Sequence, residues 1–161
     1  MNLSLHLSHA AAVGLAVTVV GVQGTVMAVD EFVFHRARAR RMPAWERMGH
    51  PLDTLTVLVP LAIALFLPLT RFHALLFAGL ALFSCLFVTK DEAVHARQCS
   101  GGEQWLHALL FLLHPLLFAA IYLLWAGGAK GWLSLQAGLT AGFLCWQFAY
   151  WNGPWAPRAF E

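Results

Sequence analysis

Long apolar runs make up most of this chain, and short polar stretches separate them. A membrane-spanning helix needs about 20 predominantly apolar residues. Five segments meet that requirement: 8–36, 51–69, 73–96, 103–126 and 131–151. The separators contain charged residues or helix breakers, as in 36–49 and 127–130. The pattern predicts an all-α, polytopic integral membrane protein, with five transmembrane helices forming one domain over residues 1–161.

Composition supports a lipid bilayer as the surrounding solvent. Hydrophobic residues make up 60% of the chain and charged residues only 11%, against about 25% charged residues in a soluble domain. No basic residue precedes Arg36, so the first segment fits a retained helix better than a secretory signal. The three cysteines show no CxxC spacing and indicate no disulfide framework. A net charge of +2 is too small to indicate a nucleic-acid partner.

Basic residues predict the orientation, because cytoplasmic loops of membrane proteins are enriched in lysine and arginine. Eight of the ten lie in the loop between spans one and two, in the loop between spans three and four, or in the C-terminal tail: Arg36, Arg38, Arg40, Arg41, Arg47, Lys90, Arg97 and Arg158. The opposite side has Arg71 and Lys130. We therefore expect a bacterial inner or plasma membrane protein with its N-terminus outside and its C-terminus in the cytoplasm.

Carboxylates and histidines gather at the predicted cytoplasmic ends of the first four spans. Residues three or four apart share a helix face. Four such pairs occur, one for each span: Glu31 with His35, His50 with Asp53, Glu92 with His95, and Glu103 with His107. His114 lies seven residues beyond His107 and extends the last pair deeper into its span. We expect these side chains to converge on one layer of the membrane.

Structural roles are the alternative for some of these residues. Ser100 and Glu103 have the spacing of a capping box. His50 and Pro51 resemble a helix start, where Asp53 would interact with the helix dipole. Asp30 and Asp91 fit solvated helix ends, paired with Lys90 or Arg36.

Capping does not explain the whole set. Glu31 and Glu92 lie near helix C-termini, where the dipole disfavours acids, and caps require no histidines. Ionisable residues at membrane depth usually face a bundle interior, and clustered carboxylates need protons or cations. These considerations favour two bound divalent metal ions. A proton relay or ion pathway, and scattered structural roles, are the other interpretations.

The residue types indicate which metal would bind. Carboxylate and imidazole without thiolate suit iron, with manganese or zinc as alternatives. Glu92-Ala-Val-His95 resembles the Glu-x-x-His motif of the di-iron and di-manganese carboxylate proteins, which are four-helix bundles. The pairs on the first and fourth spans are one residue longer, and the second span offers His50 and Asp53 instead. The resemblance implies a four-helix core around two metal ions.

Three functions fit such a centre. The first is a di-iron oxidoreductase or oxygenase near the cytoplasmic face, which acts on a lipophilic small molecule from the bilayer and uses an electron donor. The second is a zinc-dependent membrane hydrolase, in which the metal activates water. The third is a metal transporter or sensor, although no acid or paired histidine continues a path to the other face. Catalytic residues are not assigned, but Tyr150 and Gln147 on the fifth span are candidates to hydrogen-bond metal ligands.

Overall fold

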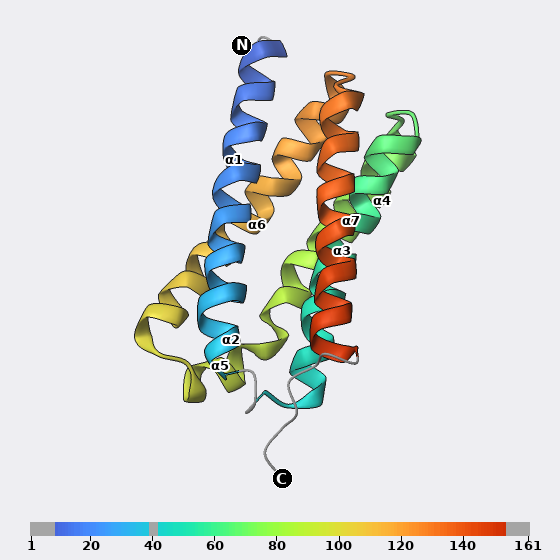
Figure 1. The fold of residues 1–161 in the computed structure, drawn as a ribbon. Coiled ribbons are helices and arrows are strands. Elements are labelled where there is room, and N and C mark those ends of the chain that lie inside the picture. The colour runs from blue at the N-terminus through green and yellow to red at the C-terminus, as the bar shows by residue number, and fades with distance from the viewer. Residues whose placement is uncertain (1–8, 39–41, 154–161) are drawn as a thin grey trace.

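The structure is a computed structural model that describes residues 9–38 and 42–153 (Figure 1). The described part is all-α. Its elements are α1 (His9–Val29), a π-helical segment (Asp30–His35), α2 (Arg36–Arg38), α3 (Ala44–Phe66), α4 (Arg71–Phe87), a 3-10 segment (Val88–Asp91), α5 (Glu92–Gln98), α6 (Gly101–Ala126) and α7 (Lys130–Asn152). Three of the basic residues that predict the orientation lie outside the described residues: Arg40, Arg41 and Arg158.

Four stretches of helix are long and apolar enough to cross a membrane: Ala10–His35, Ala44–Phe66, Arg71–Gln98 and Gly101–Ala126. They correspond to the first four predicted spans. The fifth, α7, has 23 residues, but it is not among the candidate spans found in the described part of the chain. Its buried face includes Gln136 and Gln147, so a fifth crossing stays a prediction.

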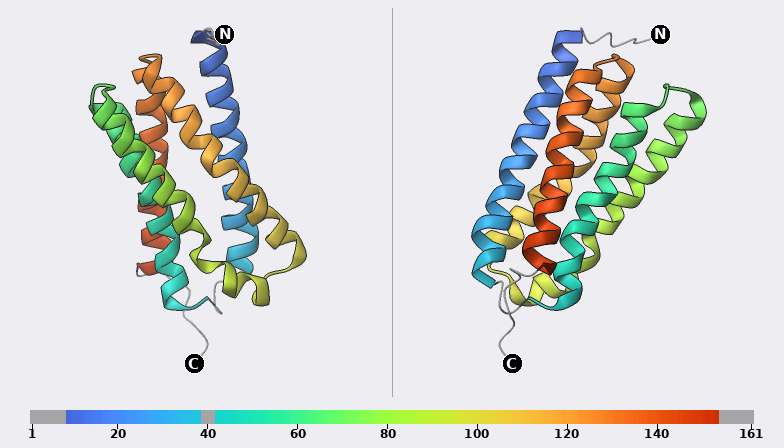
Figure 2. Two further views of the ribbon diagram at one scale, coloured as in Figure 1. Left: turned by 180° about the vertical axis from the view of Figure 1, so that it is seen from behind. Right: turned by 45° about the vertical axis from the view of Figure 1, so that its right-hand side comes forward.

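The long helices run side by side and alternate in direction (Figures 1 and 2). α1 packs mainly on α6, and α3 packs on α7 and α4. One end of the bundle holds the α3–α4 and α6–α7 connections. The other end holds the C-terminal end of α1, the beginnings of α3 and α6, and α5. We call the latter the polar end, for the reason given below.

An apolar core fills the bundle away from the polar end. Leu61, Phe77, Leu117 and Ile121 belong to it and are buried. Large apolar side chains also cover the outside, and Phe66 is 76% exposed. A contiguous apolar exterior of this kind fits a lipid environment better than water.

The second helix begins earlier than the sequence predicted. α3 begins at Ala44, so Pro51 lies inside it, and the interpretation of His50-Pro51 as a helix start is wrong. A proline inside a helix removes the hydrogen bond to the carbonyl four residues earlier. That carbonyl belongs to Arg47, and it accepts a hydrogen bond from Asn152 Nδ2 at 3.2 Å instead. The contact at the end of α7 therefore stabilises the extra turns of α3.

The third predicted span is also interrupted. α4 ends at Phe87, and a 3-10 segment over Val88–Asp91 leads into α5. A 3-10 turn is tighter than an α-helix, and the change in direction turns α5 toward the beginning of α6. This bend directs His95 into the polar end.

Candidate metal centre

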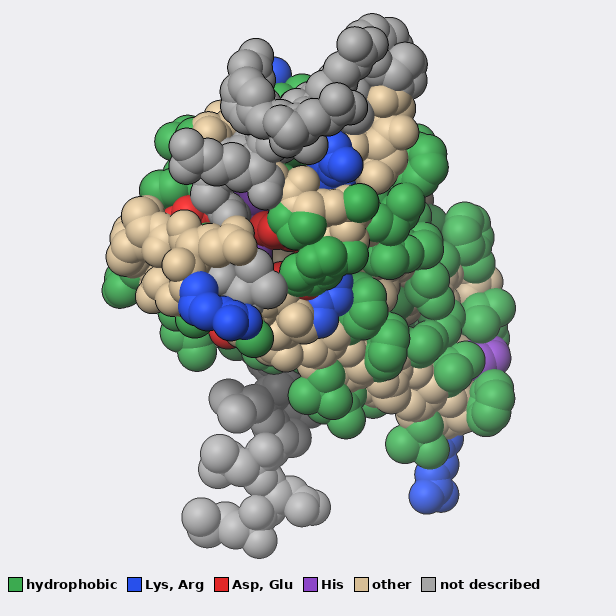
Figure 3. All heavy atoms as spheres, turned by 90° about the horizontal axis from the view of Figure 1, so that it is seen from below, with side chains coloured by type: hydrophobic (Ala, Val, Ile, Leu, Met, Phe, Trp, Pro, Cys, Tyr) green, Lys and Arg blue, Asp and Glu red, His purple; other side chains and the backbone are tan. Residues whose placement is uncertain are grey.

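Acidic and histidine side chains gather at the polar end, where the sequence analysis expected them. Figure 3 looks onto this end and shows acidic side chains among apolar, neutral and basic neighbours. The buried acidic and histidine side chains here come from the π-helical segment, α3, the 3-10 segment, α5 and α6: Asp30, Glu31, His35, Glu46, Asp91, His95, Glu103 and His107.

The π-helical segment decides which side chains of the first span face inward. A π-helix bonds residues five apart, so Asp30 and His35 lie on one face. His35 Nδ1 is 3.0 Å from the Asp30 carbonyl oxygen and 3.2 Å from Asp30 Oδ2. The expectation that Asp30 lies at a solvated helix end is wrong. Asp30 is only 9% exposed, and its Oδ1 lies 3.2 Å from His107 Nε2.

Three overlapping groups of described residues could hold a cation, and the first consists of Asp30, His35, Glu103 and His107. Each offers a ligand atom, and these atoms all lie within 4.8 Å of one another. Ser100 begins α6 by accepting a hydrogen bond from the Glu103 amide at 3.3 Å, as a capping residue does. The Glu103 side chain itself is buried in the group.

His35, Glu46 and His95 form the second group, under the same 4.8 Å limit. His95 Nε2 lies 3.0 Å from Glu46 Oε1, and Glu46 is fully buried. Glu46 was not among the predicted ligands, because residues 36–49 separate two apolar runs and were expected to form a loop. The available signal was its position four residues before His50, on the same helical face. His35 belongs to both groups, so two cation sites would be neighbours. A third combination joins His95 and His107 with Cys99.

Two histidines of these groups have the hydrogen-bonding pattern of metal ligands. His35 and His107 each contact an Asp30 oxygen through one ring nitrogen. Their other ring nitrogens, His35 Nε2 and His107 Nδ1, are buried and have no hydrogen-bond partner among the described residues. Metal-binding histidines typically bond a carboxylate with the nitrogen that does not bind the metal. The residues present therefore fit a bound cation.

Glu31 lies beside the two groups and is held by α7. Its carboxylate accepts hydrogen bonds from Trp151 Nε1 and, at 3.3 Å, from Gln147 Nε2. Gln147 Oε1 in turn accepts from Thr54 Oγ1 at 2.6 Å. Tyr150, the other candidate on this helix, accepts from Arg36 Nε at 3.3 Å.

Besides Glu31, four predicted ligands lie outside the groups: His50, Asp53, Glu92 and His114. The His50 ring packs 4.4 Å from the His35 ring between centroids. Asp53 accepts two hydrogen bonds from Lys90 Nζ, at 2.7 and 2.8 Å. Glu92 is half-buried. His114 lies deeper, where it contacts Ser84 and Gln23.

Asp91 combines a correct and an incorrect expectation. It pairs with Lys90, whose Nζ is 2.9 Å from Asp91 Oδ2, as one interpretation of the sequence proposed. The aspartate is not solvated, however, because only 3% of it is exposed. Lys90 thus contacts both Asp53 and Asp91 and compensates part of their charge.

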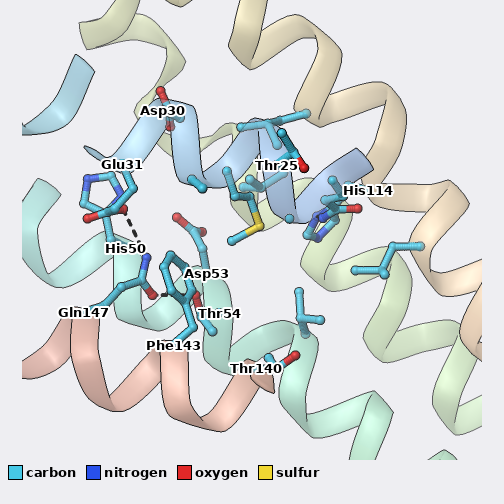
Figure 4. Close-up of a pocket in the computed structure, with 18 of the residues that line it drawn as sticks. Thr25, Asp30, Glu31, His50, Asp53, Thr54, His114, Thr140, Phe143 and Gln147 are labelled. Atoms are coloured by element: carbon cyan, nitrogen blue, oxygen red, sulfur yellow. Dashed lines mark hydrogen bonds between the residues drawn. The ribbon is translucent and has the colours of Figure 1, made fainter. Parts of the chain in front are cut away.

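A cavity of about 670 Å³ extends from these groups into the bundle (Figure 4). Asp30, Glu31 and His50 lie at one end of it in the figure, with His114 away from them and Phe143 and Thr140 on the α7 side. Its walls are mainly apolar and include Met27, Leu110 and Leu117. The cavity lies between two pairs of packed helices, α1 with α6 and α3 with α7.

Comparisons with protein-family models, curated proteins and solved structures gave no match to this chain.

Proposed function

We propose that this chain is an integral membrane protein with a dinuclear metal centre, and that it acts as a di-iron oxidoreductase or oxygenase on a lipophilic substrate. The observation that carries the proposal is the pair of adjacent groups that share His35. Manganese and zinc are the other metals that these ligands accept.

Charge supports two divalent cations. Asp30, Glu31, Glu46 and Glu103 are buried at one end of a bundle with an apolar exterior. Burying several carboxylates together is unfavourable unless cations compensate them. Lys90 forms ion pairs with Asp53 and Asp91. A pair of divalent ions bound by the two groups would add positive charge beside these carboxylates.

Ligand type supports iron over a purely structural zinc. The groups combine carboxylates with imidazoles, and oxygen ligands of this kind stabilise a metal in its higher oxidation state. Bound iron would supply redox chemistry, and an electron donor would restore the ferrous form. The chain's own contribution would be to orient the ligands: Asp30 holds two imidazoles, and Gln147 and Trp151 hold Glu31.

The cavity supports a lipophilic substrate. It is mainly apolar, and it reaches the same Asp30, His35, His95 and His107 that make up the groups. A molecule dissolved in the bilayer could therefore place one of its atoms beside the metal centre while the rest occupies the apolar part.

Metal analysis tests the proposal directly. Protein purified without chelator should contain about two metal ions per chain, as in the helical-bundle dimetal proteins. The double variant Glu46→Ala, His95→Ala should lose most of the second ion. The control His73→Ala, at the other end of the bundle, should retain both. Wild-type protein that binds no metal and melts at the same temperature with and without chelator would refute the proposal.

The identity of the metal is tested by anaerobic ferrous loading followed by air. We expect a near-ultraviolet absorption of ferric iron bound to carboxylates, and we expect Glu103→Ala with His107→Ala to abolish it. If iron binds but never oxidises, while zinc-loaded protein cleaves a lipid ester or amide, the hydrolase alternative is correct. If neither occurs and the protein moves metal across vesicles, the transporter alternative is correct.

We also propose that α7 crosses the membrane with the other four helices and that the polar end faces the cytoplasm. Two exposed glycines provide matched reporters, since a Cβ added at Gly102 or Gly131 meets no atom within 4 Å. In intact cells a membrane-impermeant thiol reagent should label Gly131→Cys and spare Gly102→Cys, with the wild-type cysteines as background. The reverse labelling would place the metal centre on the outer face.

A further inference from the structure

A chain of hydrogen bonds crosses the bundle beside the cavity, and its donors can be assigned in order. Thr56 Oγ1 donates to the Asp53 carbonyl oxygen at 2.7 Å. A hydroxyl has a single hydrogen, so Ser84 Oγ donates to Thr56 Oγ1, at 2.7 Å. Ser84 Oγ must then accept from His114 Nε2, at 2.9 Å. His114 therefore has its hydrogen on Nε2, and its Nδ1 is an acceptor.

This assignment orients the side chain of Gln23. The nitrogen Nε2 of Gln23 lies 3.4 Å from His114 Nδ1, and it is the donor in this contact because Nδ1 carries no hydrogen. The amide oxygen Oε1 remains. It is buried and has no hydrogen-bond partner among the described residues, although Gln23 is only 4% exposed and lines the cavity.

A second amide oxygen in the cavity is in the same situation. Gln136 lies on α7 and is 6% exposed. Its Oε1 is buried, and no partner for it is found in the described part of the chain. Buried acceptors are normally paired, because an unpaired one loses its hydration without compensation. Two unpaired acceptors in one apolar cavity indicate that the occupant brings hydrogen-bond donors.

We propose that the cavity binds an amphiphile with an apolar body and a hydroxyl group, an alcohol or a phenol, whose hydroxyl donates to Gln23 Oε1. A carbonyl compound has no hydrogen to donate. An ammonium group would need an available carboxylate nearby. Asp30 and Glu31 lie at the end of the cavity away from His114, and the Asp53 carboxylate between them is held by Lys90 (Figure 4). The cavity volume of about 670 Å³ and its mainly apolar walls accommodate the body.

If this amphiphile is the substrate, the inference rests on the proposed function. It then also indicates which part of the substrate reacts. Gln23 and Asp30 are seven residues apart, which is about 10 Å along a helix axis. A molecule anchored at Gln23 by its hydroxyl would thus present to the metal centre an atom about 10 Å from that hydroxyl. The chemistry would fall on the body of the molecule and leave the hydroxyl unchanged.

A matched pair of probes tests the inference without any turnover. Radiolabelled 4-nonylphenol and its methyl ether, 4-nonylanisole, differ only in the donor hydrogen and a methyl group. Binding to wild-type protein in nanodiscs is measured above that of empty nanodiscs, which corrects for partition into lipid. We expect the phenol to bind about tenfold more tightly than the ether, because only the phenol satisfies a buried acceptor.

Variants locate the effect. In Gln23→Leu the ratio of phenol affinity to ether affinity should fall to near unity, while the affinity for the ether stays as in wild type. Gln98→Leu, the same change at an exposed position outside the cavity, should keep the wild-type ratio. Two results for the wild-type protein would overturn the inference, even if Gln23→Leu fails to fold. One is equal binding of the phenol and the ether, as expected if water occupies the acceptor. The other is no binding of either probe.

Metal content measured on the same samples separates the two proposals. A phenol preference in protein that never binds metal would support the hydroxyl site and refute the dinuclear centre. Bound metal without any preference would do the reverse.

Discussion

The two ends of the bundle contain the same kinds of polar side chain in different surroundings. At the end opposite the polar end, His73 Nδ1 lies 2.7 Å from the carbonyl oxygen of Pro68, five residues earlier in the chain. Trp125, on α6, donates to the Leu67 carbonyl oxygen at 3.0 Å, where α3 ends. At the polar end, His35, His95 and His107 come from three different helical segments, and their ring centroids lie 4.4–6.2 Å apart.

The difference shows what separates a structural histidine from a candidate ligand. His73 is satisfied by backbone close to it in sequence, so its role is complete without any other helix. His35 is satisfied on one nitrogen only, by Asp30, and its ring belongs to groups with side chains from α3, α5 and α6. Buried polar groups that converge from several helices and keep open lone pairs are costly in an apolar bundle. A bound cation would remove that cost.

The largest effect is expected from His35→Ala, because His35 is common to both groups. The variant should lose nearly all bound metal, whereas Glu46→Ala, which touches only one group, should lose about half of it. Metal analysis of purified protein measures both, with His73→Ala as the control. Full metal content in His35→Ala would mean that the two groups do not form one centre.

The next largest effect is expected in the apolar core, from Ile121→Ala. Ile121 is fully buried, and removing a buried side chain of this size destabilises a protein by about 3 kcal/mol. The melting temperature should fall while the metal content is unchanged. Leu82→Ala is the control, because Leu82 is 63% exposed on the outside of the bundle. A loss of metal in Ile121→Ala would show that the two ends are not independent.

A smaller effect is expected from Lys90→Met, which removes the cation between Asp53 and Asp91. Lys90 is 22% exposed at its side chain, so the loss should be about 2 kcal/mol, less than for a fully buried pair. Thermal unfolding of the metal-loaded protein measures it. Adding Asp53→Asn should restore part of the stability, since it removes one of the uncompensated charges. No recovery in the double variant would argue against charge as the cause.

The smallest effect is expected from Gly49→Ala. A Cβ there would lie 3.0 Å from Lys90 Cε and 3.2 Å from Asp91 Oδ2, so the lysine must shift. We expect destabilisation by about 1 kcal/mol. Gly79→Ala is the matched control, since its Cβ meets no atom within 4 Å and alanine favours a helix over glycine. Equal melting temperatures for the two variants would show that Lys90 moves without cost.

The fold class and the place of the polar layer could be predicted from the sequence. Runs of apolar residues of bilayer length give four candidate spans, because hydrophobic length is a local property of the chain. The spacing rule also located histidines that do converge, since His35, His95 and His107 each lie one turn from an acid.

The partners within that layer were decided only by the tertiary structure. The π-helical segment turned Asp30 inward with His35, where a regular 3.6-residue period favours Glu31. The contact of Asn152 with the Arg47 carbonyl allowed α3 to begin before Pro51 and so brought Glu46 to His95. Lys90 paired with Asp53 across 37 positions of sequence. Each of these outcomes depends on hydrogen bonds between segments far apart in the chain, and periodicity within one segment contains no information about them.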